Sequence, residues 1–110
     1  PSMTNEGIDK STLEEGADWI AEMASEDLNG FIPSELCDLI IETELVIREE
    51  KKDPMMSHQS MATLLYQKFE SDPEIPTQEG AITEFLIREI LYWEDEFRSM
   101  AGYPRKINPS

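Results

Sequence analysis

The chain is poor in the residues that build most metal and active sites, with one histidine, His58, and one cysteine, Cys37, among 110 residues. A structural zinc site needs several cysteine or histidine ligands, so this pair is too small for one. A di-iron bundle needs two Glu-x-x-His motifs, and the sequence has none. A calcium loop and a glycine-rich phosphate loop are also missing. We therefore expect no metal site and no cofactor.

Few groups remain for nucleophilic or acid–base catalysis. One alternative is a small enzyme that pairs Cys37 with His58. Another is a small enzyme that uses Glu89, whose carboxyl pKa would rise if it were buried near Trp93. No nucleophile-elbow motif surrounds any serine, and a lone cysteine in an apolar helical pattern is more often a small core residue. The expected function is therefore not enzymatic.

Long apolar runs are absent as well. None approaches the ~20 residues that a membrane-spanning helix needs, and the sequence does not open on an apolar signal segment. A single cysteine cannot form an internal disulfide, which suits a reducing compartment. These features together predict a cytoplasmic protein.

Positive charge is scarce, because 24 acidic residues face only 9 lysines and arginines, and the net charge is −15. Such a surface repels nucleic-acid phosphates and anionic membranes, whereas it attracts a protein with a basic surface. The imbalance is greatest at the start of the chain, where residues 1–30 hold eight acids and a single base, Lys10.

Apolar residues recur at steps of three and four, which is the spacing of helices that share one interior. Ser11 and Glu14 have the spacing of a capping box and predict a first helix that ends at Asn29-Gly30. Three further helices are predicted at 34–52, from Ser57 or Ser60 to about 70, and at 78–101 after a Thr77 cap. We expect an all-α fold, a compact bundle of four main helices over residues 11–102, with flexible tails at 1–10 and 103–110.

Glutamate and arginine occur four residues apart at Glu44–Arg48 and at Glu94–Arg98. In this order the pair stabilises a helix by about 0.2–0.5 kcal/mol. The mildly basic residues 103–110 are assigned to a tail outside the bundle.

The acidic side chains of the first helix offer the clearest binding hypothesis. Spaced at about one carboxylate per turn, roughly 5–6 Å apart, they are Glu15, Asp18, Glu22 and Glu26. Apolar contacts are expected from Met55 and Met56, in a predicted loop, and from Tyr92. The expected function is a non-enzymatic protein that binds a partner protein with a basic surface through these residues.

Two alternatives stay open beside it. A row of carboxylates can imitate a row of phosphates, so the chain would be a DNA mimic that inhibits a nucleic-acid-binding protein. The predicted helix at 34–52 is apolar around much of its circumference, which also fits a homodimer.

Overall fold

A computed structural model, which describes residues 9–75 and 82–109, contains four helices and no strand within those ranges. They are α1 (Lys10–Leu28), α2 (Ser34–Lys51), α3 (His58–Glu70) and α4 (Glu84–Ala101). The predicted all-α fold of four helices is confirmed.

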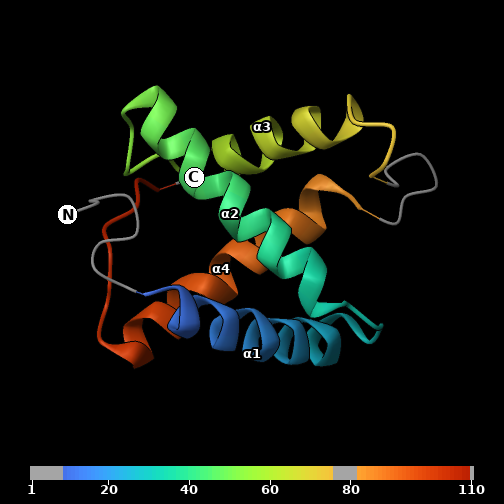
Figure 1. Cartoon of the computed structure of the whole chain (residues 1–110), viewed down its shortest axis with the longest axis vertical. Coiled ribbons are helices and arrows are strands. Elements are labelled where there is room, and N and C mark those ends of the chain that lie inside the picture. Colours follow the sequence, from blue (N-terminus) through green and yellow to red (C-terminus); the bar gives the residue numbers. More distant parts are fainter. Residues whose placement is uncertain (1–8, 76–81, 110) are drawn as a thin grey trace.

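Helices α2 and α4 lie between the other two (Figure 1). Helix α1 packs against α2 and α4, and α3 packs against the same two helices, but α1 and α3 do not contact each other. The molecule therefore has two outer faces, one formed by α1 and one by α3, on opposite sides of the α2–α4 layer.

The helix ends follow local capping chemistry and shift some predicted boundaries. Helix α1 begins one residue before Ser11, because the Asp9 side chain accepts a hydrogen bond from the Thr12 N–H at 2.7 Å. Helix α4 is capped by Thr83, whose hydroxyl accepts from the Leu86 N–H. The predicted cap Thr77 lies outside the described residues, and the helix starts later than its apolar spacing indicated.

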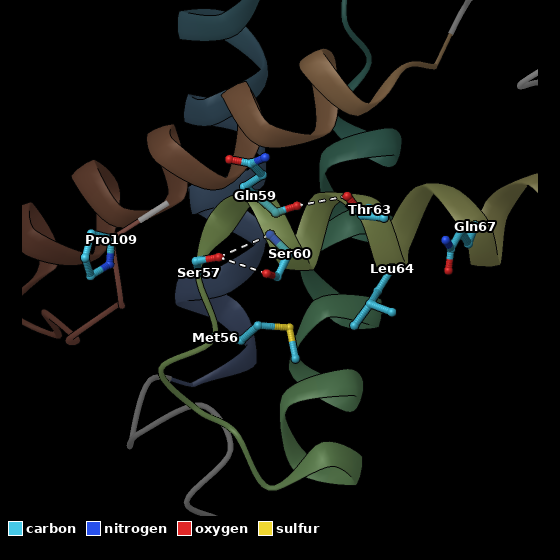
Figure 2. A pocket seen from close by; sticks show the side chains of 8 residues that line it. All are labelled: Met56, Ser57, Gln59, Ser60, Thr63, Leu64, Gln67 and Pro109. Carbon is cyan, nitrogen blue, oxygen red and sulfur yellow. Dashed lines mark hydrogen bonds between the residues drawn. The ribbon is translucent and has the colours of Figure 1, made fainter.

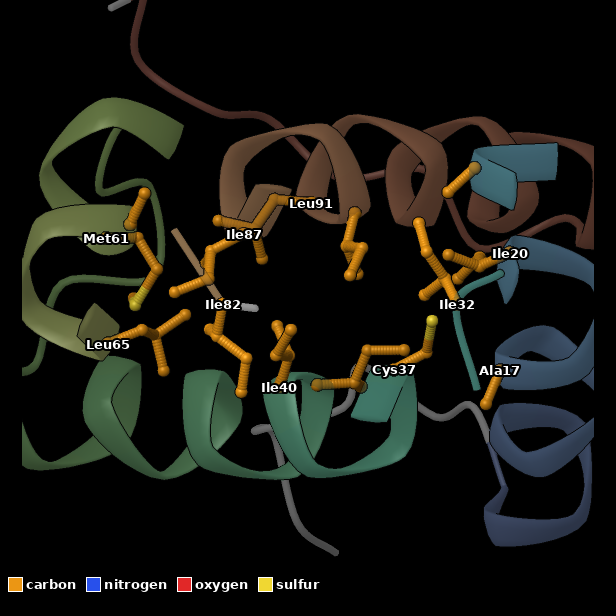
Figure 3. Packing of buried hydrophobic residues seen from close by; sticks show 14 of the residues in the cluster. Ala17, Ile20, Ile32, Cys37, Ile40, Met61, Leu65, Ile82, Ile87 and Leu91 are labelled. Atoms are coloured by element: carbon orange, nitrogen blue, oxygen red, sulfur yellow. The ribbon is translucent and has the colours of Figure 1, made fainter. Parts of the chain in front are cut away.

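One core lies between α2 and α4, with α3 at one end and α1 at the other (Figure 3). Ile40 of α2 and Leu91 of α4 are fully buried at its centre, Leu65 of α3 closes one side and Ile20 of α1 closes the other. Helix α1 approaches α4 closely at Gly16, where a Cβ atom would lie 2.7 Å from the ring of Phe97. Only glycine leaves room for that ring without a shift.

Candidate functional site

Two glutamates face the interior from the central helices. Glu44 of α2 and Glu94 of α4 are 0% and 1% exposed, although each was predicted only as half of a helix-stabilising pair with an arginine four residues on. Burying an ionised carboxylate is costly unless cations and hydrogen bonds compensate for the lost water. Their surroundings must therefore supply that compensation.

Arg105 supplies most of the positive charge and hydrogen bonds that compensate for burying these two glutamates. Its side chain is 3% exposed, and its Nη2 atom lies 2.7 Å from Glu44 Oε2 and 2.7 Å from Glu94 Oε1. The same guanidinium donates through Nε to Asp95 Oδ1 at 3.0 Å. A residue that was assigned to a flexible tail thus lies inside the domain and joins the carboxyl groups of two helices.

Asp95 extends these contacts to α3. Its Oδ2 atom lies 2.5 Å from Nε2 of His58, the first residue of that helix. The ring of Tyr92, one turn before Asp95 along α4, packs edge-on against the His58 ring with centroids 4.9 Å apart. The contacts therefore connect α2, α3, α4 and residues 103–109, which we call the C-terminal segment.

The α2–α3 connector is held by the same set of side chains. Arg48 donates to Glu44 Oε2 at 2.8 Å and to the backbone carbonyls of Pro54 and Met56 at 3.2 and 2.9 Å. The Asn108 N–H in turn donates to the Met55 carbonyl at 2.8 Å. The C-terminal segment is therefore attached at two places, to the buried carboxyl groups and to this connector.

We call this set of side chains the interior cluster; its members are Glu44, Arg48, His58, Glu94, Asp95, Arg98 and Arg105.

The pKa values of the two buried glutamates of the interior cluster are shifted in opposite directions. Burial favours the neutral form of Glu44, but Arg105, a hydrogen bond with Glu94 and Arg48 outweigh it and hold the pKa of Glu44 below its ordinary value. For Glu94, burial and the charge of Glu44 raise the pKa well above the ordinary value despite Arg105. The pair therefore favours a Glu44 carboxylate beside a protonated Glu94.

Asp95 stays ionised for a related reason. Burial acts to raise its pKa, but the hydrogen bond with His58 and the charge of Arg105 lower it overall. The three carboxyl groups in turn raise the pKa of Arg105 against the effect of its burial. The cation at the centre of the interior cluster is thus permanently charged.

Shifted pKa values of this kind mark both active sites and structural ion networks. Here Arg105 binds the carboxyl groups of Glu44, Glu94 and Asp95. Three polar atoms of the cluster, Glu44 Oε1, Arg48 Nη2 and His58 Nδ1, are buried without a hydrogen bond among the described residues. Within residues 9–75 and 82–109, no three His, Cys, Asp or Glu side chains are grouped so that they could hold a metal ion. The contacts of the interior cluster join α2, α3, α4 and the C-terminal segment.

The residues of the two enzyme hypotheses, Cys37 with His58 and Glu89, have different neighbours from those that the hypotheses assumed. Cys37 is fully buried in the apolar core, and burial raises the pKa of its thiol to about 12, so a reactive thiolate is disfavoured. His58 contacts Asp95 and Tyr92. Glu89 lies beside another carboxyl, Asp27 of α1, and their hydrogen bond, with partial burial, raises the pKa of Glu89.

The four acids predicted to bind a partner, Glu15, Asp18, Glu22 and Glu26, are all exposed on α1. None of them takes part in an ion pair with a residue that the structure describes. Partial burial and then the charges of Glu14 and Asp18 raise the pKa of Asp38 on α2, while the charge of Lys10 lowers it. Charged side chains of α1 therefore act on the start of α2, and the acids among them outweigh Lys10.

The predicted apolar contacts lie on other elements than the acids. Met55 is exposed, Met56 is half-buried against the core, and Tyr92 is 46% exposed beside α3. The methionines belong to the α2–α3 connector and Tyr92 to α4, so none of the three lies on α1. The structure brings together the acids and leaves the methionines and Tyr92 apart from them.

A pocket of about 590 Å³ lies along α3, between its polar side and Pro109 of the C-terminal segment (Figure 2). Its hydroxyl groups are engaged locally, since Ser57 accepts from the Ser60 N–H and Thr63 donates to the Gln59 carbonyl. No charged side chain is among the described residues that line it. The pocket therefore presents amide and hydroxyl groups but no general acid or base.

None of the described helices has the length and apolar character to cross a membrane. Comparison with protein-family models, curated proteins and solved structures finds no match to this chain. Function has to be argued from the molecule itself.

Proposed function

We propose that this protein is a non-enzymatic binding module that recognises a partner protein with a basic surface through the exposed acids of α1. The observation that supports this most directly is the contrast between the molecule's interior and this helix. The interior carboxyl groups have arginine partners, whereas Glu15, Asp18, Glu22 and Glu26 have no cationic partner among the described residues.

A basic partner would supply the missing positive charge. Like-charge repulsion along α1 is relieved when lysines or arginines of a partner approach, and the same field accelerates their encounter. The pKa of Asp38 on α2 is consistent with this field: burial raises it most, Glu14 and Asp18 of α1 raise it further, and Lys10 lowers it. The acids of α1 therefore act on a carboxyl group of the neighbouring helix.

The test compares two variants of equal net charge. The first replaces the four α1 acids by amides (Glu15→Gln, Asp18→Asn, Glu22→Gln, Glu26→Gln). The matched control neutralises four exposed glutamates on the other helices, Glu42, Glu50, Glu70 and Glu96. Each immobilised protein is incubated with native lysate at low and at high salt, and the bound proteins are quantified by mass spectrometry.

The proposal expects a basic protein that the wild type and the control retain at low salt, and that the α1 variant loses. Equal loss from both variants would show that only net charge matters and would overturn the assignment to α1. Duplex DNA is then added as a competitor. Release of the partner by DNA would favour the DNA-mimic function, and retention would favour an ordinary protein interface.

A further inference from the structure

An apolar groove opens next to the N-terminal end of α2, which carries Glu35 and Asp38. It encloses about 470 Å³ between the α1–α2 connector, α2, the chain after α3 and the start of α4. Its apolar lining comes mainly from Phe31, Leu36, Leu39, Ile75 and Leu86. We call it the connector groove. Its volume is at the lower end of the roughly 300–1,000 Å³ of ligand pockets, so it admits only a few side chains at a time.

Phe31 stands at this groove with 87% of its surface exposed. The backbone beside it is fixed, because the Ile32 N–H donates to Ser25 Oγ at 2.9 Å and the Ile32 side chain is buried. Pro33 then leads directly into α2. An exposed aromatic ring on a fixed backbone loses little conformational freedom when it is covered, which is typical of a binding anchor.

The charges around the connector groove are negative. Of the described residues, Glu35 and Glu74 are the charged ones that line it, and no lysine or arginine is among them. Glu35 also raises the pKa of Asp38, as do burial, which is the largest cause, and Glu14 and Asp18, whereas Lys10 lowers it. The occupant of the groove therefore has to tolerate the negative field of Glu35 and Glu74.

We propose that the connector groove is the docking site for a basic amphipathic helix of the partner protein. Apolar side chains of that helix enter the groove against Phe31, and its lysines or arginines lie beside Glu35 and Glu74. This mode, an apolar helix face laid into a groove, recurs in peptide recognition. A second copy of this chain is a poorer occupant, because it would bring another net charge of −15 to the same place. The inference rests on the proposed function and names the chemistry of the partner.

The probe is a fluorescein-labelled peptide of leucine and lysine with its leucines on one helical face. The control peptide has the same composition, with leucines distributed around the helix. Binding is measured by fluorescence anisotropy to the wild type, to Phe31→Ser, and to the α1 variant and its charge-matched control defined above. Met100→Ser is the matched apolar control, because Met100 is 62% exposed near the end of α4 and does not line the groove.

We expect the amphipathic peptide to bind the wild type at least tenfold more tightly than the control peptide. Phe31→Ser should weaken the amphipathic peptide about tenfold or more, as loss of an anchor does, while Met100→Ser changes its affinity less than about twofold. Because Phe31 is exposed, its replacement leaves the fold intact, which circular dichroism checks.

Equal affinity for the two peptides, or an unchanged affinity in Phe31→Ser, would overturn the groove as the docking site. The proposed function would survive that result if the α1 variant still weakened both peptides relative to its charge-matched control. If Phe31→Ser instead abolishes a dimer seen by analytical ultracentrifugation, the occupant is a second copy and the basic partner is wrong.

Discussion

The interior cluster and the acidic face of α1 both contain several acidic side chains, but those of the cluster are mostly buried and those of α1 are exposed to solvent. In the interior, Glu44, Glu94 and Asp95 lie within hydrogen-bonding distance of Arg105. On α1, carboxylates follow one another along an exposed face with no such cation among the described residues. Removal from water enforces pairing in the first region, whereas in the second the solvent screens each charge.

This difference separates the charges that hold the fold from those that are available to a partner. Folding depends on the buried set, because each unpaired member would carry its desolvation cost alone. The α1 acids make no comparable contact within the chain. Variants in the two regions should therefore have opposite profiles, with a large effect on stability in the interior and a large effect on binding at the surface.

The largest effect is expected from Arg105→Ala. It removes the cation shared by three carboxyl groups, and breaking a buried ion pair in this way costs about 3–5 kcal/mol. A small domain has only about 5–15 kcal/mol of stability. Chemical denaturation should therefore show a much lower midpoint, and hydrogen exchange should show loss of protection in the C-terminal segment.

Its neighbour supplies the control, because Lys106 is exposed and Lys106→Ala should change the free energy of unfolding by less than about 0.5 kcal/mol. Arg105→Lys should be intermediate, since an ammonium cannot reproduce the planar array of donors. If Arg105→Ala and Lys106→Ala proved equally stable, the interior would need no compensating cation and the comparison would fail.

A second prediction uses the pH dependence of stability. The pKa of Glu94 is raised in the folded state, so its contribution is complete below the unfolded pKa of about 4.3 and is lost as pH rises through the folded value. Glu94→Gln keeps the size and shape of the side chain and removes the group that titrates. The unfolding free energy of the wild type should fall relative to this variant above about pH 4.3, by up to ~1.4 kcal/mol per pH unit.

Asp95 is expected to give a pH dependence of stability with the opposite sign. Its folded pKa is lowered, so its stabilisation is present above the unfolded pKa of about 3.9 and disappears as pH falls through the folded value. Asp95→Asn should therefore flatten the acid side of the stability profile, whereas Glu94→Gln flattens the other side. Urea denaturation across this pH range measures both, and parallel profiles for Glu94→Gln and the wild type would contradict a protonated Glu94.

The helices were predictable from sequence because apolar spacing and end signals act locally. Ser57 before α3 and Gly102 after α4, with its positive φ of 91°, lie where the sequence indicated helix ends. The prediction of α1 missed its first residue because Asp9, rather than Ser11, provides the capping oxygen. Such errors come from competition between neighbouring polar side chains that can make the same bond.

The interior cluster could not be predicted from the sequence pattern. Glu94 and Arg98 have the spacing of an ordinary surface pair, and nothing local shows that α4 turns this side inward. The signal that was present is the position of Glu94 three residues after the buried Leu91. Arg105 could not be assigned at all, because its role depends on where the chain returns after Gly102.

A third and smaller effect is expected where the surface acids approach one another. Glu89 lies beside Asp27, and their hydrogen bond, with partial burial, raises its pKa. Because the site is mostly solvated, Glu89→Gln should stabilise the protein at pH 7 by less than about 1 kcal/mol, and the gain should vanish as pH falls below the unfolded pKa. Glu96→Gln, at an exposed position of the same helix, is the matched control.

The smallest effect on stability is expected on α1 itself. The variant with four amides relieves like-charge repulsion along the helix, and Glu26 in particular lies near the C-terminal end, where the helix dipole is also negative. Its free energy of unfolding should rise by less than about 1 kcal/mol at low salt. The difference should shrink toward 1 M salt, where the Debye length is about 3 Å. A marked loss of stability in this variant, absent from its charge-matched control, would show that these acids serve the fold and are not available to a partner.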